Sequence, residues 1–273
     1  MIYTLGPQGT FSDKAASRVA RLTGEAGAVA YLPNISSVFE RTLLEDGAIG
    51  VVPIENSVAG TVHVVQDLLV RQAVWIDHEV HVAIAFKLLV RGALGQVRRV
   101  FVHPVAERQC ADALRDLVPT AEIVFADSNT DSGAGLLAAD DEAAAVVPVD
   151  YREPTDGALR VLALRTATNN TTRFIALRRA PAVPRPDFTR EKMSLLITPR
   201  TNRPGLLHEI LGCFQRSNMN LTRIESRPSG GPWEYVFLLD TALSAQAPAA
   251  WRELTQGDWE VRLLGCYSVL REH

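Results

Sequence analysis

The sequence predicts an α/β protein with two α/β lobes followed by a small βαββαβ unit. Short apolar segments alternate with helical patterns along the first part of the chain, which is typical of mostly parallel sheets covered by helices. A long extended stretch interrupts this alternation, which then resumes, so two α/β sets are predicted. A proline-rich stretch at 180–187 precedes a compact unit of about eighty residues, a normal size for a small domain.

The first lobe is predicted from three pairs of strand and helix. The strands lie at 2–5, 29–32 and 48–54, and the helices lie at 12–23, at 36–47 and from 61 onward. Apolar residues recur three or four apart in the first helix, with Ser12 as the expected N-cap and Gly24 as the expected end. In the second helix, Phe39, Leu43 and Leu44 are expected to point inward.

The second lobe follows an extended stretch from Trp75 to Val90. Its strands are predicted at 100–102, 123–125 and 144–147, and its helices at 105–117 and 134–139. The stretch 169–177 is then expected to close this region with a strand of its own. Two lobes joined by long extended segments form a clam-shell like that of periplasmic binding proteins, in which ligands bind between the lobes.

Residues 180–190 are predicted to form a linker, because closely spaced prolines prevent a helix or sheet from continuing. We therefore expect a two-lobed domain at 1–179 and a second domain at 191–273. Strands of the second domain are predicted at 193–198, 221–226, 234–240 and 259–269, and helices at 204–216 and 249–254. This βαββαβ order is that of a ferredoxin-like plait, and Pro204 at the first helical position supports it.

The composition excludes several classes of protein. Hydrophobic residues make up 47% of the chain and charged residues 22%, the balance of a globular rather than a disordered protein. The net charge of −3 gives no reason to expect nucleic acid or an anionic membrane as a partner. No apolar run is long enough to span a bilayer and no signal peptide is recognisable, so a cytoplasmic protein is expected. The 3 cysteines are far apart and predict neither disulfides nor a metal site.

Polar residues follow predicted strands at two places where a helix is expected to begin. Thr10 follows the first strand, and the stretch 53–57 (Pro-Ile-Glu-Asn-Ser) ends the third strand before Gly60-Thr61. Two helix N-termini facing one cleft would suit a ligand with two negative groups. For Thr10 the alternative is a helix cap and nothing more. Glu55 ends an apolar run, and a partly buried carboxylate needs hydrogen-bond donors or a cation, or its pKa rises.

The stretch 169–174 (Asn-Asn-Thr-Thr-Arg-Phe) places polar residues and a cation at the mouth of a strand. There Arg173 can bind a carboxylate with two hydrogen bonds, and Thr172 can donate or accept one. The alternative is a capped turn with a solvated arginine. His103, held extended by the proline after it, and Gln109 in the next helix are further candidates. Their alternatives are a surface turn and a helix face.

No metal site or nucleotide site is predicted. His78 and His81 lie in an extended segment, where alternation places them on opposite faces, so a surface strand is the better interpretation. The sequence contains no Gly-x-Ser-x-Gly elbow, no Gly-x-Gly-x-x-Gly fingerprint and no Gly-Lys-Ser/Thr phosphate loop. Hydrolysis at a nucleophile elbow and nucleotide chemistry are therefore not expected.

Together these segments resemble the prephenate dehydratase family. The matching segments are 5–12 (Leu-Gly-Pro-Gln-Gly-Thr-Phe-Ser), 53–57, 60–62, His103-Pro104 with Gln109-Cys110, and Asn170 with Thr172-Arg173-Phe174. In the C-terminal unit, 203–207 and 220–228 are similar to the ACT domain, a regulatory domain that binds amino acids. The motifs occur in the right order over nearly the whole chain, which makes the resemblance specific.

The resemblance implies conversion of prephenate to phenylpyruvate, with loss of carbon dioxide and water and without a metal or organic cofactor. It implies that Thr172 gives a hydrogen bond to the leaving hydroxyl, with Glu55 and Gln109 as further catalytic residues. The residues that it implies in substrate binding are Thr10, Asn56, Ser57, Thr130, Arg173 and Phe174. Arg173 would either clamp a substrate carboxylate or position its loop. Because the motifs begin at residue 5, a monofunctional dehydratase is expected.

The ACT-like unit implies regulation by L-phenylalanine. The residues expected near this effector are Gly205, Leu206, Leu207, Asn220, Leu221, Glu225 and Ser226. Domains of this type pair across a two-fold axis, so a homodimer or homotetramer is expected. Val102, Asn129 and Leu206 depart from the family's pattern, and the larger Leu206 could narrow the effector pocket. Two alternatives stay open: arogenate as the substrate, and a non-catalytic two-lobed binding protein.

Overall fold

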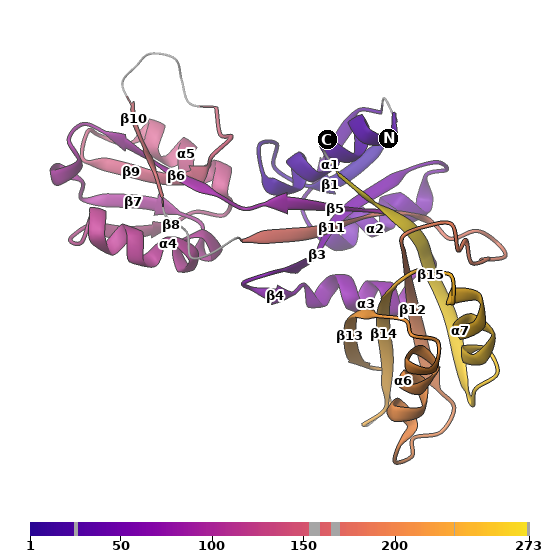
Figure 1. Ribbon diagram of the computed structural model, residues 1–273. Coiled ribbons are helices and arrows are strands. Elements are labelled where there is room, and N and C mark those ends of the chain that lie inside the picture. Colours follow the sequence, from indigo (N-terminus) through magenta and orange to yellow (C-terminus); the bar gives the residue numbers. More distant parts are fainter. Residues whose placement is uncertain (25–26, 153–158, 165–169, 232, 272–273) are drawn as a thin grey trace.

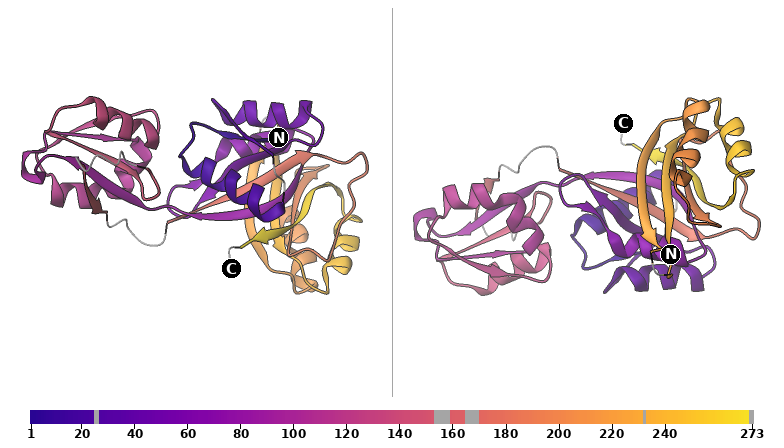
Figure 2. Two further views of the ribbon diagram at one scale, coloured as in Figure 1. Left: turned by 90° about the horizontal axis from the view of Figure 1, so that it is seen from above. Right: turned by 90° about the horizontal axis from the view of Figure 1, so that it is seen from below.

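The computed structural model describes residues 1–24, 27–152, 159–164, 170–231 and 233–271. It contains two α/β lobes and a C-terminal domain, with lobe 1 lying between the other two (Figures 1 and 2). Lobe 1 is formed by residues 1–24 and 27–83 together with 170–179, lobe 2 by 86–152 and 159–164, and the C-terminal domain by the strands and helices from Lys192 onward. The two-lobed α/β prediction is confirmed. The domain boundaries at 179 and 191 stay a prediction.

Lobe 1 is a sheet in the order β5-β11-β3-β1-β2 with helices packed on it. Its strands are β1 (Ile2–Leu5), β2 (Val29–Leu32), β3 (Ile49–Asn56), β5 (Val74–Ala83) and β11 (Thr171–Arg179). A short β4 (Gly60–Thr61) pairs with β3, and the helices are α1 (Phe11–Thr23), α2 (Ile35–Leu44) and α3 (His63–Arg71). Strands β2, β1 and β3 are parallel, whereas β11 is antiparallel to both of its neighbours.

Two helix starts in lobe 1 differ from the prediction. Thr10 rather than Ser12 is the N-cap of α1, and its side chain accepts from the backbone N–H of Asp13 at 3.4 Å. Gly60-Thr61 does not begin a helix; it pairs with Glu55 and Asn56 in an antiparallel ladder, and α3 begins at His63. The local Gly-Thr pattern suits a strand as well as a cap, and pairing with β3 decides between them. Leu44, expected to point inward, is 69% exposed.

Lobe 2 is a five-stranded sheet in the order β10-β6-β9-β7-β8. Its elements are β6 (Phe86–Arg91), the 3-10 turn η1 (Leu94–Gln96), β7 (Arg99–Val102), α4 (Pro104–Leu117), β8 (Glu122–Phe125), α5 (Asn129–Ala138), β9 (Ala143–Pro148) and β10 (Leu159–Ala163). Strand β10 was not predicted. The strand expected to close this lobe is β11, and it instead pairs in lobe 1, between β3 and β5. Asn169, at the start of that motif, lies outside the described residues.

The C-terminal domain has the predicted ferredoxin-like order β13-β14-β12-β15. Its elements are β12 (Lys192–Pro199), α6 (Leu206–Arg216), β13 (Leu221–Pro228), β14 (Tyr235–Ala242), α7 (Ala247–Leu254) and β15 (Trp259–Leu270). Helix α6 begins at Leu206 and not at Pro204, because Gly205 precedes it with a left-handed φ of 84° that no helix continues. Within the described ranges, no helix is long and apolar enough to cross a membrane.

The sheets of lobe 1 and the C-terminal domain are continuous. Strand β15 pairs in parallel with β5 from Ser268 opposite His78 to Leu270 opposite Val80. Tyr267 is fully buried in the hydrophobic cluster that also contains Ile76 of lobe 1. The C-terminal domain is therefore packed on lobe 1 as part of one folded body (Figure 1).

This junction leaves no room for a side chain at Gly265 of β15. A Cβ added there would lie 2.2 Å from the Ile76 carbonyl oxygen and 2.9 Å from the Ile76 Cβ. We expect Gly265→Ala to destabilise the protein by about 1–3 kcal/mol and to lower Tm by roughly 3–10 °C in a thermal unfolding experiment. Gly95→Ala is the matched control, because a Cβ at Gly95 meets nothing within 4 Å. Equal Tm values for the two variants would contradict the tight junction.

Candidate active site

Two hydrogen-bonded side chains, Asn56 and Thr172, lie where β3 ends and β11 begins. The register of these antiparallel strands sets Thr172 opposite Asn56, and the Asn56 Nδ2 donates to the Thr172 Oγ1 at 2.8 Å. Because the Thr172 oxygen accepts this bond, its hydroxyl hydrogen can be directed to a different acceptor. Thr172 is 8% exposed, so a ligand would meet this hydroxyl in a largely dehydrated place.

Other contacts of Asn56 fix the orientation of its amide. The Oδ1 accepts from the backbone N–H groups of Val58 at 3.0 Å and Ala59 at 2.7 Å, so the Nδ2 faces away from them. This Nδ2 also donates to the Asn170 Oδ1 at 2.7 Å. The Asn56 amide is therefore held with its Nδ2 as the donor to Thr172. Because the Thr172 oxygen accepts this bond, the Thr172 hydroxyl is left to act as a donor itself.

Asn170 is a candidate site residue to which the sequence motif assigns no role. It is 4% exposed, and its Nδ2 is buried without a hydrogen-bond partner in the part of the chain that the structure describes. A buried donor without a partner is costly unless a ligand or water satisfies it. Its spacing of two from Thr172 is the signal that could have identified it, because residues two apart share one face of a strand.

Ser57 ties the two strand ends together. Its backbone N–H donates to the Thr171 carbonyl oxygen at 2.9 Å, and its Oγ accepts from the Thr171 N–H at 2.9 Å. These two bonds hold the loop after β3 against the start of β11. Direct binding of substrate by Ser57 stays a prediction.

Arg173, next to Thr172, is directed into protein contacts. Its Nε donates to the Glu79 Oε2 at 2.6 Å, and its NH2 group donates to the Asp240 Oδ2 at 2.6 Å and to the Tyr267 hydroxyl at 3.2 Å. The Glu55 carboxylate lies 3.6 Å from its NH1 group. The side chain is only 11% exposed. These contacts are of the kind that the predicted positioning of the loop by Arg173 needs, and both predicted roles of Arg173 stay predictions.

Glu79 and Arg173 hold each other in the charged state. Burial opposes the ionised form of Glu79, but a hydrogen bond from His81 and the charges of Arg173 and Lys192 lower its pKa to about 2. Burial likewise opposes the charge of Arg173, yet the carboxylates of Asp240 and Glu79 raise the pKa of Arg173 above its ordinary value. This network of buried charges was not predicted from the sequence. The position of Glu79 directly before the apolar Val80, in a strand that returns to apolar residues at every second position, is the signal that could have indicated it.

A cavity of about 480 Å³ lies between the lobes. Lobe 1 contributes Thr10 and Lys14 to its lining, and lobe 2 contributes Thr130, Asp150 and Arg152. Lys14 and Asp150 form an ion pair across the cavity, and the Thr130 Oγ1 donates to the carbonyl oxygen of the lobe 1 residue 8 at 3.3 Å. The structure thus brings the predicted Thr10 and Thr130 to one cavity that carries both hydroxyls and cations.

The remaining predicted residues of the two-lobed domain lie elsewhere. Gln109 is on α4 of lobe 2, and its Oε1 is buried without a partner among the described residues. Phe174 is 2% exposed and packs in the core of lobe 1 with Val51 and Val80. Roles for Gln109, Phe174 and Glu55 in binding or catalysis stay predictions.

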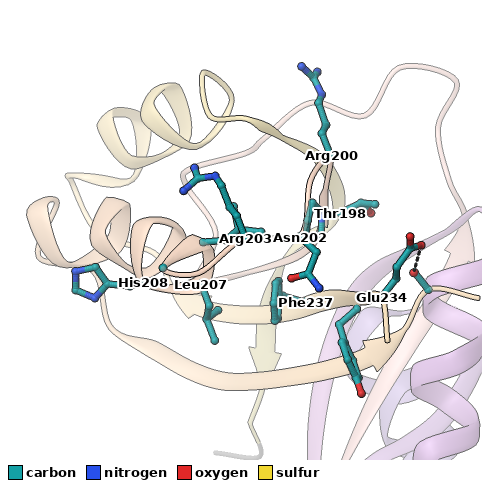
Figure 3. A pocket seen from close by; sticks show the side chains of 13 residues that line it. Thr198, Arg200, Asn202, Arg203, Leu207, His208, Glu234 and Phe237 are labelled. Atoms are coloured by element: carbon teal, nitrogen blue, oxygen red, sulfur yellow. Dashed lines mark hydrogen bonds between the residues drawn. The ribbon is translucent and has the colours of Figure 1, made fainter. Parts of the chain in front are cut away.

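A second cavity, of about 530 Å³, lies in the C-terminal domain (Figure 3). Its lining includes Asn202, Arg203, Leu207, Glu234 and Phe237. The predicted effector residues are distributed over three places. Gly205, Leu206 and Leu207 line this cavity; Asn220 and Leu221 line a separate one; Glu225 and Ser226 lie on β13, away from both cavities. The Glu225 carboxylate accepts a hydrogen bond from Thr61 of lobe 1.

The histidines set aside as metal ligands are paired with carboxylates. His78 Nδ1 lies 3.3 Å from the Asp77 carboxylate, and His81 Nε2 lies 2.8 Å from that of Glu79. No group of three or more histidine, cysteine, aspartate or glutamate side chains suited to a metal occurs within the described ranges.

Comparison with known proteins gives the same family for most of the chain. A family model described as prephenate dehydratase matches residues 2–182, and one described as ACT domain matches 199–254. The bifunctional chorismate mutase/prephenate dehydratase of Pseudomonas aeruginosa is 32% identical over 239 residues, which are 86% of this chain and 63% of that protein. The chain thus spans less than two thirds of the length of that relative.

Two further relatives match over greater shares of their length. The prephenate dehydratase of Amycolatopsis methanolica is 30% identical over 270 residues, covering 96% of this chain and 86% of that protein. The crystal structure of prephenate dehydratase in complex with L-Phe from Arthrobacter aurescens has a TM-score of 0.81 and 31% identity, covering 98% of this chain and 90% of that one. The resemblance found in the sequence motifs is confirmed.

The buried charge of Glu79 should make stability depend on pH. Its pKa lies near 2 in the folded protein against an ordinary 4.5, so its stabilisation is fully present above pH 4.5 and is lost as pH falls toward 2. We expect Glu79→Gln to lose roughly 3 kcal/mol of unfolding free energy at pH 7, and this difference from the wild type to narrow between pH 5 and pH 2. Urea denaturation at a series of pH values measures it. Glu122→Gln, at an exposed position, is the control, and a difference for Glu79→Gln that does not change with pH would contradict the assignment.

Proposed function

The chain belongs to the prephenate dehydratase family, and on this premise we propose that it converts prephenate to phenylpyruvate, with loss of carbon dioxide and water. The observation that carries the proposal is the hydrogen bond from Asn56 to the Thr172 oxygen, which makes Thr172 a donor at a strand end. The reaction needs such a donor at the leaving oxygen.

In the proposed reaction, the bond between the ring and its carboxylate breaks and carbon dioxide leaves. The released electron pair completes the aromatic ring as the carbon–oxygen bond to the ring hydroxyl breaks. The departing hydroxide takes a proton that comes from solvent and leaves as water. Aromatisation drives the step, so the protein has to hold the dianion and stabilise the leaving oxygen.

Thr172 would donate a hydrogen bond from its hydroxyl to the leaving oxygen. The ordinary pKa of an aliphatic hydroxyl is far too high for proton transfer, so a hydrogen bond is the role that its chemistry allows. The fixed donor Asn56 supports this role, because it occupies the Thr172 oxygen and orients the hydrogen. The unpartnered Nδ2 of Asn170 could supply a second donor to the substrate.

We propose that a dianionic substrate binds in the cavity between the lobes, where Lys14, Arg152 and the hydroxyls of Thr10 and Thr130 lie beside the carboxylates of Asp13 and Asp150. Thr172 is not among the residues that line this cavity, so the proposal requires the substrate to reach from the cavity to the strand end. We further propose that not every predicted site residue contacts the substrate. Some of them hold the site in place from the surrounding structure; the candidates are Glu55, Ser57, Gln109, Arg173 and Phe174. We expect a cytoplasmic enzyme.

We also propose that L-phenylalanine is an effector that binds in the C-terminal domain. A relative of the same family has been solved in complex with L-Phe, and the cavity lined by Leu207 and Phe237 offers apolar contacts beside Arg203 and Glu234. Strand β13 lies at the edge of the sheet order, so a second copy could pair there and form a homodimer or homotetramer. Such pairing could bring Glu225 and Ser226 toward the cavity of a partner.

The proposed activity is tested by following the appearance of phenylpyruvate from prephenate, with and without L-phenylalanine. A parallel assay with arogenate, followed by competition between the two substrates, identifies the preferred one. Absence of turnover with both substrates would contradict the proposed enzymatic activity and favour the alternative of a non-catalytic binding protein.

Removal of the Thr172 hydroxyl should reduce kcat far more than it changes KM. Thr172→Val keeps the shape of the buried side chain but loses the donor, and we expect kcat to fall by about 10²–10³-fold. Thr172→Ser keeps the hydroxyl and should retain most of the activity. Steady-state kinetics with prephenate measure both variants, and an unchanged kcat in Thr172→Val would rule out the proposed role.

The location of the effector site is tested by two substitutions on α6. Leu207→Glu places a carboxylate in the larger cavity, whereas Leu211→Glu places one in the separate cavity beside Asn220. We expect Leu207→Glu to weaken L-phenylalanine binding at least 10-fold in calorimetry, because a charge would face the apolar ring of the ligand, and Leu211→Glu to leave it unchanged. If only Leu211→Glu weakened binding, the effector site would lie in the cavity beside Asn220. If the wild type gave no heat on addition of L-phenylalanine, the proposal that L-phenylalanine is an effector would be wrong.

A further inference from the structure

Both strands that carry the Asn56–Thr172 pair are linked to the C-terminal domain, β11 directly and β3 through β4. On β11, Arg173 follows Thr172 and donates to Asp240 of β14. On the other side, Thr61 of β4 pairs with Glu55 of β3 and donates to Glu225 of β13. The hydrogen bond at the candidate active site is therefore attached to the C-terminal domain through two separate contacts.

The contact with Asp240 is part of a closed ring of buried side chains. Arg173 donates to Asp240 at 2.6 Å and to the Tyr267 hydroxyl at 3.2 Å, and Ser194 Oγ lies 2.6 Å from Asp240 and 2.8 Å from Tyr267. The ionised Asp240 only accepts, so Ser194 donates to it and Tyr267 donates to Ser194. Arg223 lies 3.8 Å from the same carboxylate.

Each member of this ring is placed by a different strand. Ser194 is on β12, Asp240 on β14 and Tyr267 on β15, and each of the three is at most 3% exposed. Three strands of one sheet thus hold the Asp240 carboxylate, and that carboxylate holds the Arg173 guanidinium. Movement of these strands relative to lobe 1 cannot leave Arg173 in place, because the contacts are buried and short.

Arg173 lies beside a bulge in β3, on the edge of β11 opposite the one that pairs regularly with β5 from Thr171 to Ala176. It lies opposite Glu55, whereas Phe174 lies opposite Pro53, so Ile54 is an extra residue in β3 at this point. Such a bulge bends the strand and re-aims the side chains beside it. Where the pairing with β3 is irregular, the side-chain contacts of Arg173 add an anchor one residue after Thr172, next to the regular pairing of β11 with β5.

The cavity of the C-terminal domain is built on two of the strands that form the ring. Thr198 of β12 and Phe237 of β14 line the cavity, and Ser194 and Asp240 lie on these same strands. A ligand in the cavity would contact the strands that carry Ser194 and Asp240, which gives it a physical connection to Arg173.

We infer that Asp240 is a positioning residue for the reaction in the two-lobed domain: it acts through Arg173 on Thr172, and the same contact transmits the binding of L-phenylalanine in the C-terminal cavity. This inference rests on the proposed function. The other carboxylates on Arg173, those of Glu79 and Glu55, belong to lobe 1, so Asp240 is the carboxylate by which the second domain acts on this arginine.

The test compares two interdomain ion pairs. Asp240→Asn removes the charge at Arg173 and keeps the side-chain shape. Asp67→Asn removes the carboxylate that accepts from Arg227 at 2.6 Å, a pair that joins α3 to β13 without touching Arg173. We expect Asp240→Asn to lower kcat at least 10-fold with KM within 3-fold, and to abolish the response of kcat to L-phenylalanine while its Kd in calorimetry stays within 3-fold. Asp67→Asn should keep both wild-type kcat and the response.

A double-mutant cycle separates action through Arg173 from general damage. If Asp240 acts through Arg173, the kcat of Arg173→Gln combined with Asp240→Asn should equal that of Arg173→Gln alone. If the kcat of the double variant were instead lowered by the product of the two single effects, the inference would be wrong. If Asp240→Asn does not fold, Tyr267→Phe opens the same ring with little change in volume, and it should lower kcat about 3–10-fold and weaken the response. Wild-type behaviour of a folded Asp240→Asn or Tyr267→Phe would also overturn it.

Hydrogen exchange gives a readout that does not require turnover. L-phenylalanine should change the exchange of the amides at 171–176 in the wild type and in Asp67→Asn, but not in Asp240→Asn. If the wild type does not convert prephenate, only the proposed function is contradicted. If the exchange response to L-phenylalanine persists in Asp240→Asn, the positioning role of Asp240 is contradicted.

Discussion

The architecture depends on one buried cation, the Arg173 guanidinium, at the place where the sheet of lobe 1 meets that of the C-terminal domain. Its buried charge is compensated by Glu79 and Asp240, which both contact it at 2.6 Å, one from each side of the junction. Removing either carboxylate leaves a buried charge with too few partners, which is costly. The two domains are therefore joined by an electrostatic requirement as well as by the β15–β5 ladder and the apolar cluster around Tyr267.

A buried ion cluster of this kind is a weak source of net stability, because desolvation offsets most of its Coulomb energy. What it supplies is a single geometry. The guanidinium satisfies several acceptors only in one position, and the residue before it, Thr172, takes its place at the strand end accordingly. The same reasoning applies to Asn56, whose amide accepts from the backbone at Val58 and Ala59 and so has one orientation. Both halves of the candidate catalytic pair are thus fixed by contacts within the protein.

The differences between prediction and structure share a cause. Gly60-Thr61 precedes an apolar helical pattern and satisfies the local rules for a helix start, yet it forms a strand because β3 lies beside it. Residues 171–177 follow lobe 2 in the sequence but lie in lobe 1, where they pair between β3 and β5. Leu44 fits the helical period but lies at the end of α2, beyond the sheet that would cover it. In each case the choice depends on a partner distant in sequence.

The sequence by itself determined the two α/β sets, the ferredoxin-like C-terminal order, the family and the residue types at the strand ends. Periodicity, glycine and proline positions and short motifs are local properties, so they can be read without a partner. Only the tertiary structure decided that Asn56 contacts Thr172, that Thr10 and Thr130 share a cavity between lobes, and that Arg173 faces Glu79 and Asp240. These contacts join residues far apart in the chain, and their geometry is set by strand register and burial, which no local pattern specifies.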